Sequence, residues 1–383
     1  MVVYDIAAYG SMIADVGRTA CYARALQARV SPGAAVLDIG TGSGILALLA
    51  CRAGARKVYA LEPDDVIQVA REAAAASGFA DRVQFLQANS LAVDLPEPVD
   101  GIVADLHGVL PIFGTSIASL LDARDRFLKP GGWMIPSRES LFVAVISCPT
   151  RHASLIEPWQ SEYGFDFSGA RARTMNRWNR ALVESKELVV APQSWATLNY
   201  QELRTPSVSG KASWTLSRRV TAHGLCVWFG CEVAPGIGFS NSPTEEERHV
   251  YRQAFFPWPR STELQVGDSV SVGLRADFVR PDYVWTWTTH VIDGDSGSIK
   301  AAYAQSTLQG TPISRERLRK RGHIFVPTTN DNVRIDRRIL ELMDDGLTVG
   351  DIAARVLSEY PLRLKDWTAA LTRVGDLSER YSA

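Results

Sequence analysis

The stretch VLDIGTGSGILALLA, from Val36 to Ala50, decides the fold of this chain. A run of apolar residues that predicts a strand enters a turn with glycines at Gly40, Gly42 and Gly44, and an apolar helical segment follows. A strand, a glycine turn and a helix in this order present backbone N–H groups and the positive end of a helix dipole to a ligand. The sequence therefore predicts a ligand site at this turn.

The segments on both sides, from about residue 34 to 148, alternate between β-rich runs and Ala-rich helical runs. This alternation is typical of a doubly wound parallel sheet, and it predicts an α/β, Rossmann-like domain over residues 1–148, with an N-terminal helix. The segment ASLLDARDRFLKPGG is expected to be a helix that stops at Lys129 and is followed by a turn through Gly132. The expected strands are AAVLDIG, KVYALE, RVQFLQAN, VDGIVADL and GWMIPSRESLFVAVI.

Two further sequence patterns follow the α/β region. Long, Trp-rich segments such as YVWTWTTHVI alternate apolar and polar residues, which predicts antiparallel strands and a β-barrel domain over 149–328. Residues 160–195 fit neither period and are expected to form a projecting arm. Three short helical patterns predict a small helical or winged-helix module over 331–383, with Thr348 and Asp351 as a capping pair.

Composition narrows the class of protein. The chain has 383 residues, enough for two or three domains, and a formal net charge of -1, so no overall charge favours nucleic acid or a membrane as partner. It lacks a signal-like N-terminus and a run of roughly 18 apolar residues, so a cytoplasmic protein is expected. The five cysteines are scattered, which predicts reduced, buried thiols and no metal site.

Three details around the glycine turn indicate S-adenosyl-L-methionine rather than a dinucleotide as the ligand. Asp38 stands before the glycines and is expected within the turn, where it could meet an ammonium group but would repel a pyrophosphate. The loop GTGSG lacks the later glycine of the dinucleotide pattern. Glu62 follows the second strand, where it could accept hydrogen bonds from both ribose hydroxyls. The backbone around Gly40, Thr41 and Gly42 completes the predicted cofactor site.

Several motifs resemble those of protein arginine methyltransferases. The segment MIADVGRTACY, from Met12 to Tyr22, is similar to a helix of that family, and the glycine turn is similar to its cofactor site. YGFDFS, HGLCVWFGCEV and FSNSPTEEERHVYRQAFFPW follow in the family's order. The resemblance implies that Arg18 grips the cofactor carboxylate, that Met12 lines the sulfonium region and that Asn89 and Ser90 lie beside adenine. It also implies a dimerisation arm over about 163–190 and a head-to-tail homodimer.

The acceptor site departs from this family. Its members present two glutamates nine residues apart that clamp a guanidinium, whereas this chain has Asp105 and Gly114 in their places. Where the family has threonine, histidine and tryptophan, this chain has His249, Val250 and Tyr251. Because a guanidinium is best held by two carboxylates, these departures favour a non-guanidine acceptor, a natural product or a modified peptide, for N- or O-methylation.

Asp105, at the end of a parallel strand, and His107 are the first candidates for catalytic residues, since an imidazole can act as a base near neutral pH. His249 and Tyr251 are weaker candidates. A structural role is an open alternative for each of these residues. For Asp105 that role would be to cap the following turn. Two other functions also stay open, namely genuine arginine methylation in which another acid such as Glu139 replaces the lost partner, and an idle scaffold that binds the cofactor.

The tail adds one further hypothesis. ILELMDDGLTVGDIAARVLSEYP is similar to small winged-helix domains that bind precursor peptides by strand addition, although a plain structural appendage is an open alternative.

Overall fold

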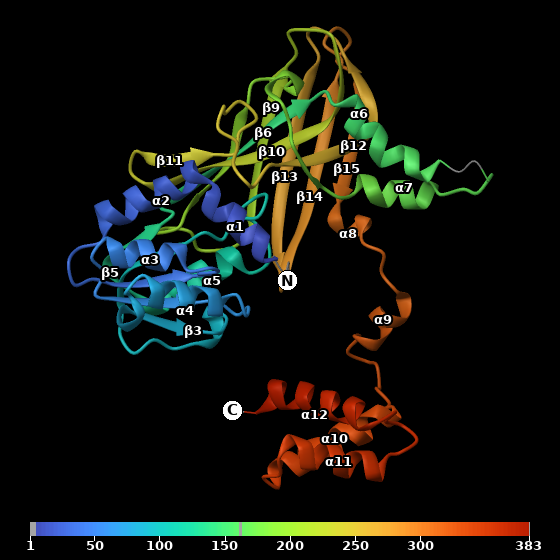
Figure 1. Cartoon of the computed structure of the whole chain (residues 1–383). Helices are drawn as coiled ribbons and strands as arrows, with labels where there is room; N and C mark the ends of the chain where they lie inside the picture. Colours follow the sequence, from blue (N-terminus) through green and yellow to red (C-terminus); the bar gives the residue numbers. More distant parts are fainter. Residues whose placement is uncertain (1–4, 161–162, 383) are drawn as a thin grey trace. The chain divides into compact units, whose positions relative to one another are not determined.

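The computed structural model describes residues 5–160 and 163–382, which divide into two compact units, Met1–Pro312 and Ile313–Ala383 (Figure 1). None of the helices in these described ranges is both long and apolar enough to cross a bilayer. All five cysteines are buried thiols, as predicted, and none of them pairs in a disulfide.

The first unit opens with a five-stranded parallel sheet in the order β3-β2-β1-β4-β5, which confirms the doubly wound prediction. The order reverses between β1 and β4, and ligands of such sheets bind beyond the carboxyl ends of the strands at this point. The strands are β1 Ala35–Ile39, β2 Lys57–Leu61, β3 Val83–Leu86, β4 Val99–Ala104 and β5 Leu128–Ile135. The helices are α1 Ile6–Ala14, α2 Val16–Arg29, α3 Ile45–Arg52, α4 Ile67–Ala76 and α5 Ser116–Phe127, with short 3-10 turns at Ala80–Arg82 and Ser90–Ala92.

Two details of the last parallel strand differ from the prediction. The segment from Lys129 to Gly132 is not a turn after the helix: it lies within β5, where the register of pairing with β4 shifts. The run from Gly132 to Ile146 is not one strand, because it divides at Pro136 into β5 and β6. Proline has no N–H to donate to a ladder, so the sheet cannot continue unbroken through it. As a result β5 belongs to the parallel sheet and β6 to the next sheet.

The rest of the first unit contains two antiparallel sheets. One has the order β7-β12-β10-β6-β8 with β11 paired to β10, and the other has the order β15-β14-β13-β9. The strands are β6 Arg138–Ile146, β7 Asn179–Ala181, β8 Gln193–Asn199, β9 Val208–Thr215, β10 Val220–Ala234, β11 Ile237–Ser240, β12 Gln253–Leu264, β13 Ser269–Val279, β14 Asp282–Ile292 and β15 Ile299–Ser306. Strand pairing within the described ranges does not close these sheets into the single barrel that the sequence predicted.

The tryptophans explain why the alternating segments fold this way. Along β14 every second residue is buried, so Trp285 and Trp287 face the core while their neighbours face outward. Within the expected arm the structure has α7 Ser168–Met175 and β7, while α6 Pro149–Ile156 and a turn at Glu157–Trp159 precede it. Helices α6 and α7 project from the sheets in Figure 1. A turn at Ser185–Glu187 and the short α8 Thr307–Gly310 complete the unit.

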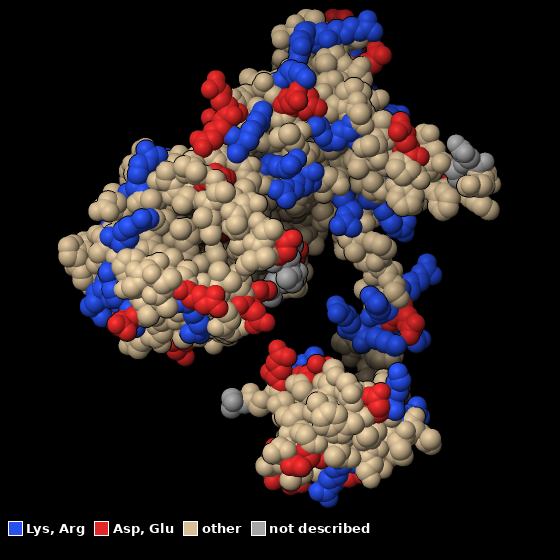
Figure 2. All heavy atoms as spheres, viewed as in Figure 1, with Lys and Arg blue, Asp and Glu red and all other residues tan. Residues whose placement is uncertain are grey.

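The second unit is helical: α9 Arg315–Lys320, α10 Asp331–Asp344, α11 Val349–Glu359 and α12 Trp367–Tyr381. Thr348 caps α11 by accepting from the N–H of Asp351, as the sequence predicted. Residues 313–382 contain no strand, so this module has the helical form rather than the winged-helix form of the prediction, and binding of a peptide to it stays a prediction. Basic side chains gather over α9, whereas both signs mix over the visible face of the first unit (Figure 2).

Candidate functional site

The glycine turn after β1 takes a backbone path that only glycine adopts without strain. Gly40, Gly42 and Gly44 have φ values of 71°, 53° and 90°. A Cβ added to Gly42 would lie 2.8 Å from a ring carbon of Tyr9, and one added to Gly40 would lie 2.6 Å from a methyl carbon of Leu106. The turn is therefore a close-fitting cradle, closed on one side by α1 and on the other by the loop after β4.

Asp38 lies inside β1 rather than in the turn, where the sequence had placed it, and it is fully buried. Its Oδ2 accepts a 2.5 Å hydrogen bond from the Thr41 hydroxyl. It also lies beside the amide of Ala47 in the first turn of α3, yet its Oδ1 makes no hydrogen bond of ordinary geometry. Burial raises the pKa of Asp38 to about 7, despite the opposing hydrogen bond from Thr41.

Glu62 joins the end of β2 to the glycine turn. Its Oε2 accepts a 3.0 Å hydrogen bond from the N–H of Gly42, and its Oε1 accepts one of 3.0 Å from the N–H of Asp64. Burial raises the pKa of Glu62, and these two backbone hydrogen bonds oppose that rise. The carboxylate is thereby fixed beside the cradle.

The two residues expected beside adenine follow β3 and differ in their surroundings. The amide oxygen of Asn89 accepts from the N–H of Leu91, so this exposed side chain caps a turn. Ser90 is buried and its hydroxyl has no hydrogen-bond partner. Of the pair, Ser90 retains an unsatisfied polar atom for a ligand.

These features together fit S-adenosyl-L-methionine. Arg18 Nε, Asp38 Oδ1 and Ser90 Oγ are buried polar atoms without a partner, and such atoms are rare in folded proteins. They offer a donor for a carboxylate, an acceptor for an ammonium group and a hydroxyl. S-adenosyl-L-methionine carries a carboxylate, an ammonium group and hydroxyls, the kinds of group that such atoms pair with.

A second cluster begins at Asp105, directly after β4. Its carboxylate forms an ion pair with Arg18 and accepts a 2.7 Å hydrogen bond from the hydroxyl of Tyr251. Arg18 also donates a 2.6 Å hydrogen bond to the backbone oxygen of Met12, so Met12 lies beside the Arg18 guanidinium. The Tyr22 hydroxyl donates to the backbone oxygen of Ala104 at 3.2 Å. The structure thus brings Met12, Arg18, Asp105 and Tyr251 together.

His107 continues the cluster inward. Its Nδ1 lies 2.6 Å from Asp105 Oδ1, and its Nε2 contacts Glu139 Oε1. The other oxygen of Glu139 accepts a 2.6 Å hydrogen bond from the hydroxyl of Tyr200, which follows β8. Glu139 and Tyr200 are fully buried. Sequence reasoning named Glu139 only as a replacement acid and missed Tyr200; the available signal was one acid within the otherwise apolar run ESLFVAVI of β6.

His249 does not join this cluster. Its Nδ1 lies 2.9 Å from Asp15 Oδ1, and the N–H of Val250 donates to Asp15 Oδ2 at 3.0 Å. Asp15 is the N-cap of α2, so these contacts tie the loop before β12 to the helix that carries Arg18. Gly114 contributes only a backbone N–H, which donates to Asp282. The side chain of residue 114 therefore cannot replace the family's second glutamate, and the carboxylate beside it belongs to Asp282.

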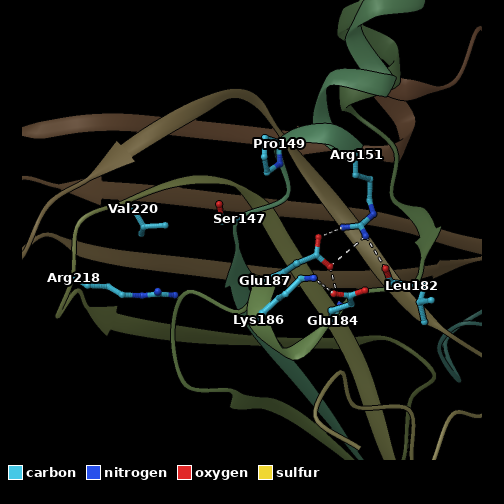
Figure 3. Close-up of a pocket in the computed structure, with 9 residues that line it drawn as sticks. All are labelled: Ser147, Pro149, Arg151, Leu182, Glu184, Lys186, Glu187, Arg218 and Val220. Atoms are coloured by element: carbon cyan, nitrogen blue, oxygen red, sulfur yellow. Dashed lines mark hydrogen bonds and ion pairs between the residues drawn. The ribbon is translucent and has the colours of Figure 1, made fainter. Parts of the chain in front are cut away.

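A pocket of about 510 Å³ lies elsewhere, around the ends of β6 and β10 that are far from Glu139. In Figure 3 four of its charged side chains turn toward one another, and Arg218 stands apart: Arg151 pairs with Glu187 at 3.0 Å and Lys186 with Glu184 at 2.6 Å. None of the predicted site residues lines this pocket. The candidate site therefore stays with the cradle and the Asp105 cluster.

Comparison with known families divides the chain where the parallel sheet ends and the antiparallel sheets begin. A model of the ribosomal protein L11 methyltransferase family matches residues 17–138, and the arginine methyltransferase oligomerization subdomain matches residues 137–282. The chain is 32% identical over 263 residues to protein arginine N-methyltransferase 6 of Xenopus tropicalis, an alignment that covers 64% of this chain and 76% of the relative. It is 31% identical to the "Probable protein arginine N-methyltransferase 6" of Arabidopsis thaliana, where the alignment covers 61% of this chain and only 55% of the relative.

Solved structures share the fold. The heterotetrameric PRMT1 enzyme-prozyme complex of Trypanosoma brucei with AdoHcy matches with a TM-score of 0.71 and 22% identity over 79% of this chain and 98% of its own. Arabidopsis thaliana protein arginine methyltransferase 10 matches with a TM-score of 0.68 and 21% identity over 79% and 97%.

Proposed function

This chain belongs to the protein arginine N-methyltransferase family, and we propose that it transfers methyl groups from S-adenosyl-L-methionine to arginine side chains of a protein or peptide. One observation carries the proposal: Ile39 and Ala104 are paired in the parallel sheet, so the cofactor cradle and Asp105 follow neighbouring strand ends at the point where the strand order reverses. A methyl donor and its acceptor placed there would be side by side.

The family acts with S-adenosyl-L-methionine, which supplies a methyl group on a positively charged sulfur when it is bound. We assign Asp38 to the ammonium group of the cofactor and Glu62 to its ribose hydroxyls, because each presents a fixed, buried carboxylate oxygen at the cradle. We assign the backbone of Gly40, Thr41 and Gly42 to the face that the ligand approaches, since there is no room for a Cβ at either glycine.

Three elements complete the assigned cofactor site. Arg18 supplies a guanidinium for the carboxylate of the cofactor, with its Nε as an unsatisfied donor. Met12 and the pair Asn89 and Ser90 line the sulfur and adenine regions, as the resemblance implies. Of these, Ser90 has a hydroxyl that lacks a partner inside the protein.

We assign the binding of the acceptor to Asp105. Its side chain keeps 12% of its surface exposed, while its neighbours Arg18 and His107 are buried. Its carboxylate can accept hydrogen bonds from a guanidinium, and the Tyr251 hydroxyl fixes its orientation. The comparisons do not support the natural-product acceptor that Gly114 suggested. The relatives whose alignment with this chain covers 76% of their own length are named protein arginine N-methyltransferases. We therefore propose a rebuilt clamp for arginine.

The test is methyl transfer from labelled S-adenosyl-L-methionine to an arginine-rich peptide, with the same peptide carrying lysine for arginine as the acceptor control. We expect Asp105→Asn to lower kcat/KM at least about 100-fold while AdoHcy binding persists, since the clamp loses its charge. Asp94→Asn, which removes an exposed acid of the same domain, should act like the wild type. Label on lysine, or on no peptide despite bound cofactor, would contradict arginine methylation; the latter would favour an idle scaffold.

We also propose a head-to-tail homodimer. The matched oligomerization subdomain includes the arm, where Phe165 is 70% and Phe167 is 44% exposed. Ile6, Ile13 and Val16 on α1 and α2 are similarly exposed, and together they offer an apolar surface for the arm of a second copy. Light scattering should give twice the 42.0 kDa of one chain, and Phe165→Asp should halve that mass. A single-chain mass for the wild type at micromolar concentration would refute the dimer.

A further inference from the structure

The two ring nitrogens of His107 both face carboxylates. Nδ1 lies 2.6 Å from Asp105 Oδ1 and Nε2 contacts Glu139 Oε1. A neutral imidazole has one N–H and one lone pair, so it can donate to only one of two ionised carboxylates. An imidazolium donates to both. The geometry at His107 therefore fits a charged ring, although its side chain is only 1% exposed.

The groups around this ring come from six parts of the chain. Burial is the largest single influence and lowers the pKa of His107, but the charge of Glu139, the Tyr22 hydroxyl and hydrogen bonds to Cys231 and Glu139 together outweigh it and hold the pKa well above its ordinary value. The Phe229 ring stacks on the imidazole at 4.8 Å between centroids. The titratable or charged groups that face it are Asp105 on its own loop, Arg18 and Tyr22 of α2, Glu139 of β6, Tyr200 after β8, Cys231 of β10, and Tyr251 before β12.

Two cations already meet the single carboxylate of Asp105, namely Arg18 and a protonated His107, and all three groups are buried or nearly so. An acceptor guanidinium adds a third cation beside the same carboxylate, in a water-poor site where poorly paired charges are costly. A guanidinium cannot release its proton, whereas an imidazole can. His107 is thus the group able to lower the positive charge at Asp105.

We propose that Glu139 is a positioning residue that supplies, through His107, the second negative charge of the acceptor clamp, so that a guanidinium binds at Asp105 in exchange for the Nδ1 proton of His107. Glu139 keeps Nε2–H in place, and Tyr200 anchors the carboxylate by its 2.6 Å hydrogen bond. The released proton goes to solvent, and the bare Nδ1 then accepts a hydrogen bond from the guanidinium. This exchange replaces the glutamate that is missing at Gly114, and it rests on the proposed function.

The first test is calorimetry of an arginine-rich peptide binding to the full-length chain saturated with AdoHcy, at pH 7 in phosphate and in Tris. These buffers differ in ionisation enthalpy, so their difference in heat counts released protons. We expect about one proton for the wild type, and affinity that rises with pH. Glu139→Gln should release none and bind the peptide about tenfold or more weakly, with AdoHcy affinity unchanged. If Glu139→Gln binds the peptide with the wild-type affinity and releases as many protons as the wild type, the proposal is overturned.

Two controls separate this role from a purely structural one. Glu232→Gln removes a carboxylate next to Cys231, which pairs with Glu139 across β10 and β6, and should behave like the wild type. Tyr200→Phe removes one hydroxyl and should weaken peptide binding in the same direction as Glu139→Gln, so it replaces that variant if Glu139→Gln does not fold.

The second test needs no acceptor. In ¹⁵N spectra of histidine side chains, with the signal assigned through His107→Gln, His107 should remain doubly protonated above pH 7 in the wild type and become neutral in Glu139→Gln. A neutral His107 at pH 7 in the wild type overturns the exchange. If His107 titrates as expected and the arginine peptide still does not bind, the error lies in the proposed function.

Discussion

The backbone N–H of Gly42 donates a 3.0 Å hydrogen bond to Glu62 Oε2, and this contact joins the ends of two neighbouring parallel strands. The glycine turn therefore fixes the position of the Glu62 carboxylate. Removing its charge should therefore affect the ligand more than the fold.

Glu62→Gln is expected to weaken AdoHcy binding roughly ten- to hundredfold, since hydrogen bonds to a charged group contribute about 1.5–3 kcal/mol. Isothermal titration calorimetry measures this change. Asp81→Asn, an exposed acid in a 3-10 turn of the same domain, is the matched control and should leave affinity unchanged. An affinity for Glu62→Gln equal to that of Asp81→Asn would remove Glu62 from the cofactor site.

Cofactor binding should depend on pH through Asp38, whose pKa burial raises to about 7. The carboxylate form binds the ammonium group of the cofactor, and protonation destroys that form. The dissociation constant for AdoHcy should thus be flat above pH 7 and rise by up to about tenfold for each pH unit below it.

The same shift affects folding in the ligand-free protein. The folded chain holds the Asp38 proton up to about pH 7 and the unfolded chain releases it near its ordinary value, so this group's contribution to stability falls as pH rises from about 4 to 7. Asp38→Asn should abolish both dependences. A wild-type AdoHcy affinity that is constant from pH 5.5 to 8.5 would contradict the assignment.

Gly42→Ala and Gly78→Ala form a matched pair, because both glycines have positive φ, 53° and 74°. Each substitution should cost about 1–2 kcal/mol of unfolding free energy, measured in urea. An added Cβ at Gly78 meets open space, whereas at Gly42 it would lie 2.8 Å from the ring of Tyr9. Only Gly42→Ala should also lose AdoHcy affinity, by tenfold or more. Equal AdoHcy affinities in the two variants would show that the turn does not contact the ligand.

Truncation after Pro312 should leave AdoHcy affinity within about twofold of the full chain, since the two units have separate buried cores and independent sites contribute additively. The buried core of the second unit, which includes Ile339, Ile352 and Val356, shares no residue with the core that surrounds the cradle. Thermal unfolding of the truncated chain should retain the transition of the first unit. A large loss of cofactor affinity would show that the second unit takes part in the site.

The cofactor half of the site was predictable from local sequence because its parts lie on consecutive strand ends. The turn at Gly40 to Gly44 and the acid at Glu62 each follow a strand that its own pattern reveals. The segment at Lys129 misled because proline and glycine usually end a helix by a turn, whereas Leu128 and Trp133 on its two sides pair with β4 and hold it within a strand.

The acceptor half depends on contacts that no local pattern encodes. Arg18 and Asp105 are 87 positions apart in the chain, and they meet because α2 packs over the end of β4, where Tyr22 also contacts Ala104. The sequence leaves both a structural and a catalytic role open for His107, because Glu139, which contacts its Nε2, lies on a different strand. The sequence placed His249 and Tyr251 together as candidates, but one faces Asp15 and the other Asp105.

The division of one long run into β5 and β6 has a mechanical consequence. Only Pro136 and Ser137 separate a strand of the parallel sheet from the strand that carries Glu139. Two residues form a short joint with little slack, so a rotation of one sheet against the other would be transmitted almost directly to the spacing between Asp105 and Glu139. The alignment of donor and acceptor halves is thereby inherited from the chain's connectivity, and an insertion at this joint would decouple them without touching a single side chain of the site.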